Sequence, residues 1–406
     1  MVFILLLIGG INLYRTFALY EEKKEFNVLR GRVPKFGTKI QYYLDDIPQE
    51  DIPEKDAYGV KVSCDQEVAY SWDYDEWKLN LPKEVKTITC EVKFYTMPDN
   101  FSGYIMKLSF FDDSVVVEDH AATFQTPALT DYRYIGASPN NYVCLEEIGD
   151  CKTEDGEIDE NMLYRIIGVI PTQSRVPSEE NPNEEIQYEN RVKLISAISY
   201  GNFPWSGSGS NTKNDWYQST LNTSVLNQTY WNSISNYHKY IDDTKWFLGA
   251  YYDTDNTKWT PATFYAGERG NTGAGSAKTT IYIVSPIGLL YPSDYGYATS
   301  GGATGRETCL GYAMSSGYWG STRDNTYKQC RENDWLIPNS GYLWTITTGV
   351  SSSDTAWVVR SGDVYSGYRV YNNSWAVHPI FHLKSNVEYN GGDGTYNNPY
   401  RIKIKS

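Results

Sequence analysis

The last third of the chain is a run of short, turn-bounded strands crowded with Tyr, Trp, Ser, Gly and Asn. Segments such as Ala356–Val364 and Val377–Leu383 alternate with Gly, Asn and Asp, which favour turns over long helices. With 36 Tyr and 12 Trp among 406 residues, the chain has ample large side chains for β cores. We therefore expect a mostly β fold with short helices, of the α+β class, in roughly two or three folded units.

The net charge restricts the partners that the chain can bind. The formal charge of −14 at pH 7 argues against nucleic acid, because phosphates require a basic face. It also disfavours an anionic membrane surface. We therefore expect no nucleic-acid partner.

The N-terminal residues 1–30 form the most apolar segment. Val2–Ile8 begins an apolar run that reaches about Tyr14, and Phe17–Tyr20 adds a second patch before the charged stretch Glu21–Glu25. A spanning helix needs roughly 20 residues, so the run is short, and it lacks a positive n-region. We interpret residues 1–30 as a membrane anchor or signal segment that begins upstream, with a buried core helix as the alternative. This interpretation predicts a cell-surface protein, anchored at its N-terminus, with most of the chain extracellular.

Six cysteines fall into three local pairs. Six cysteines allow 15 connectivities, and sequential pairing is the simplest of them because each pair lies within one predicted supersecondary unit. An even count behind an export segment favours an oxidising compartment, and no C-x-x-C motif points to zinc or redox chemistry. The expected disulfides use Cys64 with Cys90, Cys144 with Cys151, and Cys309 with Cys330.

Residues 31–126 have the pattern of a small β domain. In the segment Glu76–Leu81, polar Lys78 and Asn80 alternate with apolar side chains, as in a half-buried strand. Tyr104–Phe111 and Val115–Phe124 are expected to form a closing hairpin. The pattern predicts an immunoglobulin-like β-sandwich, acting as a stalk, in which Cys64 and Cys90 join two strands across the core. The other expected strands are Lys39–Leu44, Gly59–Cys64, Ala69–Trp72 and Thr87–Tyr95.

Residues 127–406 form the second expected domain. Leu163–Val169 is a clear strand, and Asp215–Ile234 carries spaced apolar side chains that indicate one or two short amphipathic helices. Beyond these helices, Tyr282–Val284 and the final third return to strand and turn signals. Trp344, Trp357, Phe381 and Leu383 are expected in the core.

Several motifs in this second domain resemble a known family. Asp131–Tyr142, Tyr164–Gly168 and Ile287–Tyr297 resemble exported surface proteins of Gram-positive gut bacteria. Trp357–Val364 followed by Asn373–Pro379 is similar to the closing motif of their C-type-lectin-fold module. The same motif occurs in formylglycine-generating-enzyme-like proteins and in the variable proteins of diversity-generating retroelements. The resemblance covers roughly residues 127–400 and implies a C-type-lectin-fold head that binds ligands.

Two departures from the family pattern concern possible chemistry. Val377–His378–Pro379 stands where the family usually has Val-Arg-Pro, which puts a bracing role of that Arg in doubt. The calcium-dependent sugar motifs of animal lectins, Glu-Pro-Asn and Trp-Asn-Asp, do not occur. Cys330 is the last cysteine, so the oxidation carried out by the formylglycine-generating branch is not expected.

The histidine pair and the glycine-rich loop of this domain are interpreted as structural features and not as metal or phosphate sites. His378 and His382 stand four apart, but Pro379 argues against a helix, and strand positions four apart lie about 13 Å from each other. The glycine-rich loop Gly270–Gly275 lacks the strand, helix and Lys-Ser/Thr of a phosphate-binding loop. No metal, cofactor or catalytic residue is expected.

The turn-borne polar and aromatic residues of the last third are the candidate ligand surface, because rigid aromatics mixed with small polar residues are typical of binding surfaces. We expect an unidentified extracellular protein or glycan as the ligand, and adhesion or recognition rather than catalysis as the function. Alternatives are an exported glycan-active hydrolase and a structural pilus-like or stalk subunit. The candidate residues are Asp354, Arg360, Asp363, Tyr365, Tyr368, Arg369, Tyr371, Asn372, Asn373 and Trp375.

Overall fold

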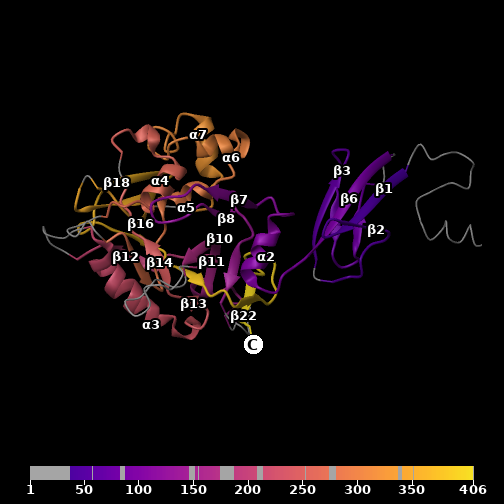
Figure 1. Ribbon diagram of the computed structural model, residues 1–406, viewed down its shortest axis with the longest axis horizontal. Helices are drawn as coiled ribbons and strands as arrows, with labels where there is room; N and C mark the ends of the chain where they lie inside the picture. Colours follow the sequence, from indigo (N-terminus) through magenta and orange to yellow (C-terminus); the bar gives the residue numbers. More distant parts are fainter. Residues whose placement is uncertain are drawn as a thin grey trace, which may run out of the picture. The chain divides into compact units, whose positions relative to one another are not determined.

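The computed structural model describes most of the chain beyond its N-terminal segment (Figure 1). The described residues are 37–56, 58–82, 87–145, 151–153, 155–173, 187–207, 214–251, 253–273, 280–336, 341–350 and 352–405. The structure is 38% strand and 20% helix, which confirms the mostly β, α+β class. The chain divides into two compact units, Met1–Met97 and Pro98–Ser406.

The smaller unit is a four-stranded sheet with a separate hairpin. The sheet has the order β2-β1-β6-β3, with β1 parallel to β6 and β3 antiparallel to it. Trp72 and Trp77 of the hairpin place their rings 5.2 Å and 5.6 Å from the ring of Phe94, which is fully buried. The strands are β1 (Gly37–Leu44), β2 (Ile47–Gln49), β3 (Tyr58–Cys64) and β6 (Thr87–Thr96), with the hairpin β4 (Ser71–Asp73) and β5 (Lys78–Asn80).

The disulfide of this unit differs from the expected arrangement. Cys64 and Cys90 are bonded, but they are directly opposite each other on β3 and β6, with Cα atoms 4.1 Å apart. The bond therefore joins neighbouring strands of one sheet. In antibody domains the corresponding bond crosses between two sheets. This difference weighs against the immunoglobulin-like assignment.

The larger unit contains two main sheets and a hairpin. The first sheet follows β13-β20-β11-β10-β9-β22-β21, and β8 pairs with β10 and β7. The second sheet has the order β12-β19-β16-β17-β18. The strands of the first sheet are β7 (Val115–His120), β8 (Leu129–Tyr134), β9 (Tyr142–Cys144), β10 (Leu163–Gln173), β11 (Tyr188–Ser196), β13 (Ile241–Asp242), β20 (Ile380–Leu383), β21 (Val387–Tyr389) and β22 (Tyr400–Ile404). Those of the second are β12 (Gly201–Pro204), β16 (Tyr342–Thr348), β17 (Thr355–Arg360), β18 (Asp363–Arg369) and β19 (Ser374–Val377), and the hairpin is β14 (Thr244–Phe247) with β15 (Tyr282–Ser285).

Short helices connect and cover these sheets. The predicted helical region Asp215–Ile234 holds η3, η4 and α3, so that expectation is confirmed. The α-helices are α2 (Phe101–Leu108), α3 (Trp231–Ser233), α4 (Pro261–Glu268), α5 (Pro292–Tyr297), α6 (Arg306–Leu310) and α7 (Asn325–Glu332). The remaining helical segments are η2 (Glu160–Met162), η3 (Trp216–Gln218), η4 (Leu221–Tyr230), η5 (Ser235–Tyr237), η6 (Asn256–Lys258) and η7 (Gly302–Thr304).

The expected hairpin that closes the first domain is wrong. Residues 101–108 form the helix α2, because Asn100 caps Gly103 N at 2.9 Å and Phe101, Ile105 and Leu108 share one buried face. Strand β7 pairs with β8 of the larger unit. The division of the chain into compact units therefore falls between Met97 and Pro98, whereas the sequence placed the boundary at residues 126/127.

A buried ionic cluster links several elements of the larger unit. Asp294 on α5 accepts hydrogen bonds from Lys193 Nζ at 2.5 Å and from Arg133 Nη1 at 3.0 Å. Arg133 Nη2 also donates to Asp131 Oδ2 at 2.6 Å, and His120 Nε2 lies 2.9 Å from the same oxygen. Asp131 and Asp294 lie in two of the motifs behind the family resemblance, so those motifs contribute charged residues to the core.

The expected membrane anchor is not supported by the structure. Within the described residues, no helix is long and apolar enough to cross a membrane, which contradicts the predicted membrane-anchored location. The segment behind that prediction, residues 1–30, lies outside the described residues.

Candidate ligand-binding site

An aromatic cluster lies on strands β16, β18 and β19 of the second sheet. Trp375 places its ring centre 4.3 Å from that of Tyr342 and 5.2 Å from that of Tyr368. Tyr365 extends the cluster, with its ring centre 5.3 Å from Tyr368 and 37% of its surface exposed. Strands β19 and β16 are neighbours, and β17 separates β16 from β18, so the sheet gathers rings that are up to 33 residues apart in the chain, between Tyr342 and Trp375. We call these four residues the aromatic cluster.

An ion pair holds the edge of this cluster. Arg360 Nε and Nη2 donate to the two carboxylate oxygens of Asp363 at 2.6 Å and 3.0 Å, and the guanidinium lies 4.2 Å from the ring centre of Tyr365. The hydrogen bonds to Asp363 raise the pKa of Arg360, which keeps this cation charged. Asp363 is buried, so its carboxylate orients Arg360 and does not face solvent.

Gly362 allows the tight connection between β17 and β18. Its φ of +108° lies in the left-handed region, and a Cβ there would come within 2.2 Å of Arg331 Cδ. The turn therefore packs directly on the side chain of Arg331, which extends from α7. This contact fixes where β18 begins and thus where Tyr365 lies.

The remaining candidates form a second group at the far end of β18. Arg369 Nη1 donates to Tyr371 Oη at 2.9 Å, and its Nε lies 3.5 Å from Asp354 Oδ2. Asn373 Nδ2 donates to the carbonyl oxygen of Arg369 at 3.1 Å, and Asn372 is exposed in the turn. Most of the ten candidates lie on strands β18 and β19 or their ends, so the structure brings them together on one sheet.

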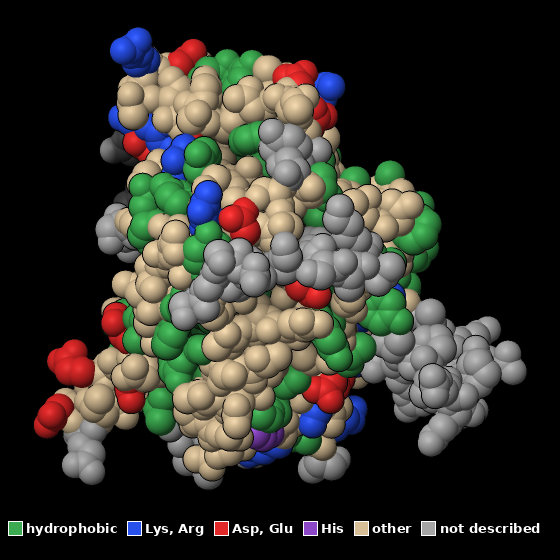
Figure 2. All heavy atoms as spheres, turned by 90° about the vertical axis from the view of Figure 1, so that its left-hand side faces the viewer, with side chains coloured by type: hydrophobic (Ala, Val, Ile, Leu, Met, Phe, Trp, Pro, Cys, Tyr) green, Lys and Arg blue, Asp and Glu red, His purple; other side chains and the backbone are tan. Residues whose placement is uncertain are grey.

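A cavity of about 720 Å³ opens beside the aromatic cluster. Tyr342 and Trp375 belong to both, so the cavity and the cluster form one continuous surface. Figure 2 shows the face of the larger unit on the side of β12 and β18, where charged side chains are scattered among hydrophobic and uncharged polar ones. A volume of this size is in the usual range for small-molecule sites. Other lining residues include Arg165, Ser196, Asn202, Trp335 and His378.

The ionisable residues that line the cavity differ in how far they are exposed to solvent. Asp334 is 1% exposed, and burial raises its pKa well above the usual range although the amide of Leu336 donates to Oδ1 at 2.9 Å. Burial lowers the pKa of His378, whose Nδ1 lies 2.9 Å from the carbonyl oxygen of Ser196. Glu332 is exposed and lies 3.7 Å from Lys328. Burial thus disfavours the charged form of both His378 and Asp334.

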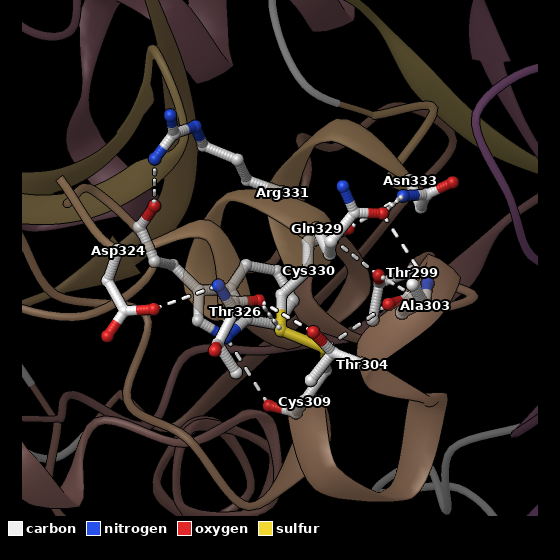
Figure 3. Close-up of a disulfide and its surroundings, with 12 residues drawn as sticks. Thr299, Ala303, Thr304, Cys309, Asp324, Thr326, Gln329, Cys330, Arg331 and Asn333 are labelled. Atoms are coloured by element: carbon white, nitrogen blue, oxygen red, sulfur yellow. Dashed lines mark hydrogen bonds between the residues drawn. A yellow bond between two sulfur atoms is a disulfide. The ribbon is translucent and has the colours of Figure 1, made fainter. Parts of the chain in front are cut away.

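The Cys309–Cys330 disulfide supports the wall of the cavity (Figure 3). It joins α6 to α7, and α7 ends just before Asp334, Trp335 and Leu336 of the cavity lining. Asp324 caps α7 through the amide of Thr326 at 2.8 Å, as Figure 3 shows. All six cysteines are paired as the sequence predicted, including Cys144 with Cys151.

Sequence reasoning found Tyr365, Tyr368 and Trp375 of the aromatic cluster but missed Tyr342 and the cavity. Trp344, Trp357, Phe381 and Leu383 are buried as expected, and His382 lies in the core on β20, away from the cavity lining. Arg165, Trp335 and Asp334 were not predicted, because Arg165 lies on β10 and the other two follow α7, so they come together only in the folded chain. A usable signal did exist: Arg165 is a lone cation between apolar neighbours on a strand.

Comparison of the chain with protein-family models, curated proteins and solved structures finds no match. The case for function therefore rests on the geometry of the site itself.

Proposed function

We propose that this protein is a recognition protein that binds an extracellular protein or glycan through the aromatic cluster and the adjoining cavity. The observation that carries the proposal is the continuity of the two, since Tyr342 and Trp375 line the cavity and pack within the cluster. Aromatic side chains give large contact area at low entropic cost, and binding energy concentrates on such residues. Three disulfides fit a protein that works under oxidising conditions.

Trp375 adds a specific polar contact to this surface. Its indole Nε1 is buried and has no hydrogen-bond partner in the described part of the chain. A buried indole N–H normally finds an acceptor, so a ligand oxygen would satisfy this group. The cluster thus offers apolar contact area together with one directional donor.

Binding rather than catalysis is the better account of the cavity. A glycan hydrolase needs two carboxyl groups that reach the substrate from either side of the bond. The cavity has Glu332 and Asp334, but Asp334 is 1% exposed and one of its oxygens is engaged by Leu336 N. A C-type-lectin-like fold for the larger unit remains part of the proposal and rests on the sequence motifs.

The test is binding to a printed array of glycans and extracellular-matrix proteins. The triple variant Tyr365→Ala, Tyr368→Ala, Trp375→Ala should lose the binding of the unaltered protein while keeping its cooperative thermal unfolding. Retained binding in a folded triple variant would contradict the proposal. Release of shortened glycan from the array, lost in Glu332→Gln, would favour the hydrolase instead, and concentration-dependent self-association without ligand would favour a structural subunit.

A further inference from the structure

Arg165 is a half-buried cation of the cavity lining, and no carboxylate among the described residues pairs with it. Its Nε donates to Asn141 Oδ1 at 2.9 Å, and the guanidinium carbon lies 4.2 Å from the ring centre of Trp335 and 4.7 Å from that of Tyr142. Nη2 is buried and has no hydrogen-bond partner among the described residues. Burial lowers the pKa of Arg165 to about 10, which is the direction expected when no anion lies nearby.

Three other buried arginines of the same unit lie beside carboxylates, whereas the buried Arg331 donates to the backbone carbonyl oxygens of Trp319 and Ser321. Arg133 pairs with Asp131 and Asp294, Arg191 pairs with Glu189 and Asp242, and Arg269 lies 3.3 Å from Glu268. Proteins place buried charges in such pairs because an isolated charge is costly to remove from water. Among the described residues, Arg165 has no such carboxylate, and it lies where the protein surface is hollow. An anion supplied by a ligand would complete the pairing seen at the other three.

The surroundings of Arg165 preserve its charge and its orientation. The rings of Trp335 and Tyr142 hold the guanidinium by cation–π contacts, which fix its plane. Of the acidic residues in the lining, Glu332 is exposed near Lys328, and burial disfavours the charged form of Asp334. Burial also disfavours the charged form of His378. Among the described lining residues, Arg165 thus supplies the positive charge of the cavity.

The rest of the lining suits a ring with hydroxyl groups. Tyr342 and Trp375 offer aromatic surface, and Trp375 also offers its unpartnered Nε1. Asn202 and Ser374 place polar side chains at exposed positions of the lining. A sugar matches this lining, because its ring can pack on the aromatic side chains and its hydroxyl groups can hydrogen-bond to the polar ones. A guanidinium presents paired donors that match the two oxygens of a carboxylate.

We infer that the cavity binds a sugar that carries a carboxylate, a hexuronic acid, with the carboxylate at Arg165 and the ring against Trp375 and Tyr342. This inference rests on the proposed function, because it names the ligand class of the same site. The cavity volume of about 720 Å³ leaves room for a neighbouring sugar of the same chain. The predicted ligand is therefore an acidic glycan.

The experiment is an NMR titration of the tryptophan indole signals of the full chain with glucuronic acid, galacturonic acid and trigalacturonic acid at neutral pH. Each acid is compared with a neutral counterpart on the same protein, either glucose, galactose or the methyl ester of glucuronic acid. We expect saturable shifts with at least one acid and affinity at least tenfold lower for its neutral counterpart. The comparison of glucuronic acid with its methyl ester uses the unaltered protein, so it tests the inference even if a variant at Arg165 fails to fold.

Variants then assign the effect to Arg165. Arg165→Gln should weaken acid binding at least tenfold, Arg165→Lys should weaken it less, and Arg323→Gln, at an exposed arginine outside the cavity lining and outside the candidate ligand surface, should leave it unchanged. Equal binding of acids and neutral sugars, or no shift with any acid at millimolar concentration, would overturn the inference. If the array ligand still binds through the aromatic cluster in that case, the proposed function stands without it. Loss of both acid binding and array-ligand binding would contradict both the inference and the proposed function.

Discussion

At the residue scale, buried charge governs how the larger unit responds to pH. Glu268 is fully buried, and burial raises its pKa from 4.5 to about 7, although Arg269 and Ser293 oppose the shift. The native state therefore keeps this proton at pH values where the unfolded chain has lost it. Stability from this group is present below about pH 4.5 and is lost as the pH rises toward 7.

Glu268→Gln should remove this part of the pH dependence. Relative to the variant, the unaltered protein should lose up to about 3 kcal/mol of unfolding free energy between pH 4.5 and 7. Urea unfolding at several pH values measures the difference between the two proteins. Glu332→Gln, at an exposed carboxylate, is the control and should leave the curve of the unaltered protein unchanged. A constant difference between Glu268→Gln and the unaltered protein would contradict this account.

Asp294, in the buried ionic cluster, has a pKa shifted in the opposite direction to that of Glu268. Burial alone would raise its pKa, but Lys193 and Arg133 hold it well below its usual range. Asp294→Asn would leave these two buried cations without their shared anion. We expect a loss of about 3–5 kcal/mol in unfolding free energy, measured by urea unfolding at pH 7. Lys258→Gln, at a largely exposed ammonium 3.7 Å from Asp253, should cost less than about 1 kcal/mol. Similar losses in the two variants would contradict a special role for the cluster.

At the element scale, the Cys309–Cys330 disulfide holds α6 and α7 together and so supports the cavity wall. The bond closes a loop with a sequence separation of 21. Replacing both cysteines by Ser should lower the stability of the larger unit by about 2–4 kcal/mol. Amide hydrogen exchange should speed up in Asn325–Glu332 and at Trp335.

The matched control is the double Ser variant at Cys64 and Cys90, which lie in the smaller unit. It should leave exchange in α7 unchanged. Equal effects of the two variants on α7 would show that the wall does not depend on its local disulfide.

Elements with local signals could be predicted from the sequence, and those set by long-range packing could not. Strand β10 was predicted because Leu163–Val169 is apolar except at Arg165, and the local cysteine pairs were found by proximity. Helix α2 was mistaken for a strand because Tyr104–Phe111 contains aromatic residues suited to either structure. Its cap, Asn100, was the overlooked signal.

In the candidate site, too, the residues with a local signal were predicted and those brought together by long-range packing were not. Tyr365, Tyr368 and Trp375 were predicted from composition, and they do lie together on β18 and β19. Asp363 was included with them, but its burial beneath Arg360 depends on the packing of α7 against the turn. Arg165 and Trp335 are 170 residues apart in the sequence, so no local pattern could join them in one cavity.

At the scale of the whole molecule, the division at Met97/Pro98 predicts that the larger unit folds alone. Its two main sheets, the buried ionic cluster and two of the disulfides lie entirely within Pro98–Ser406. A chain that begins at Pro98 should therefore unfold cooperatively at the temperature of that unit in the full protein. Calorimetry measures both transitions.

A chain that begins at residue 127 is the control for this boundary. It lacks α2 and β7, which pack within the larger unit, and should fold poorly. Normal folding of that shorter chain would contradict the boundary.

The central claim is that the aromatic cluster binds the ligand, and a matched pair of tyrosine variants tests it most directly. Tyr365 and Tyr282 are 37% and 39% exposed, and each has a cation over its ring, Arg360 in one case and Lys245 in the other. The measurement is the affinity of Tyr365→Ala and Tyr282→Ala for the ligand retained on the array. The account predicts at least a tenfold loss for Tyr365→Ala and none for Tyr282→Ala. Equal affinities of the two variants, or a loss confined to Tyr282→Ala, would contradict it.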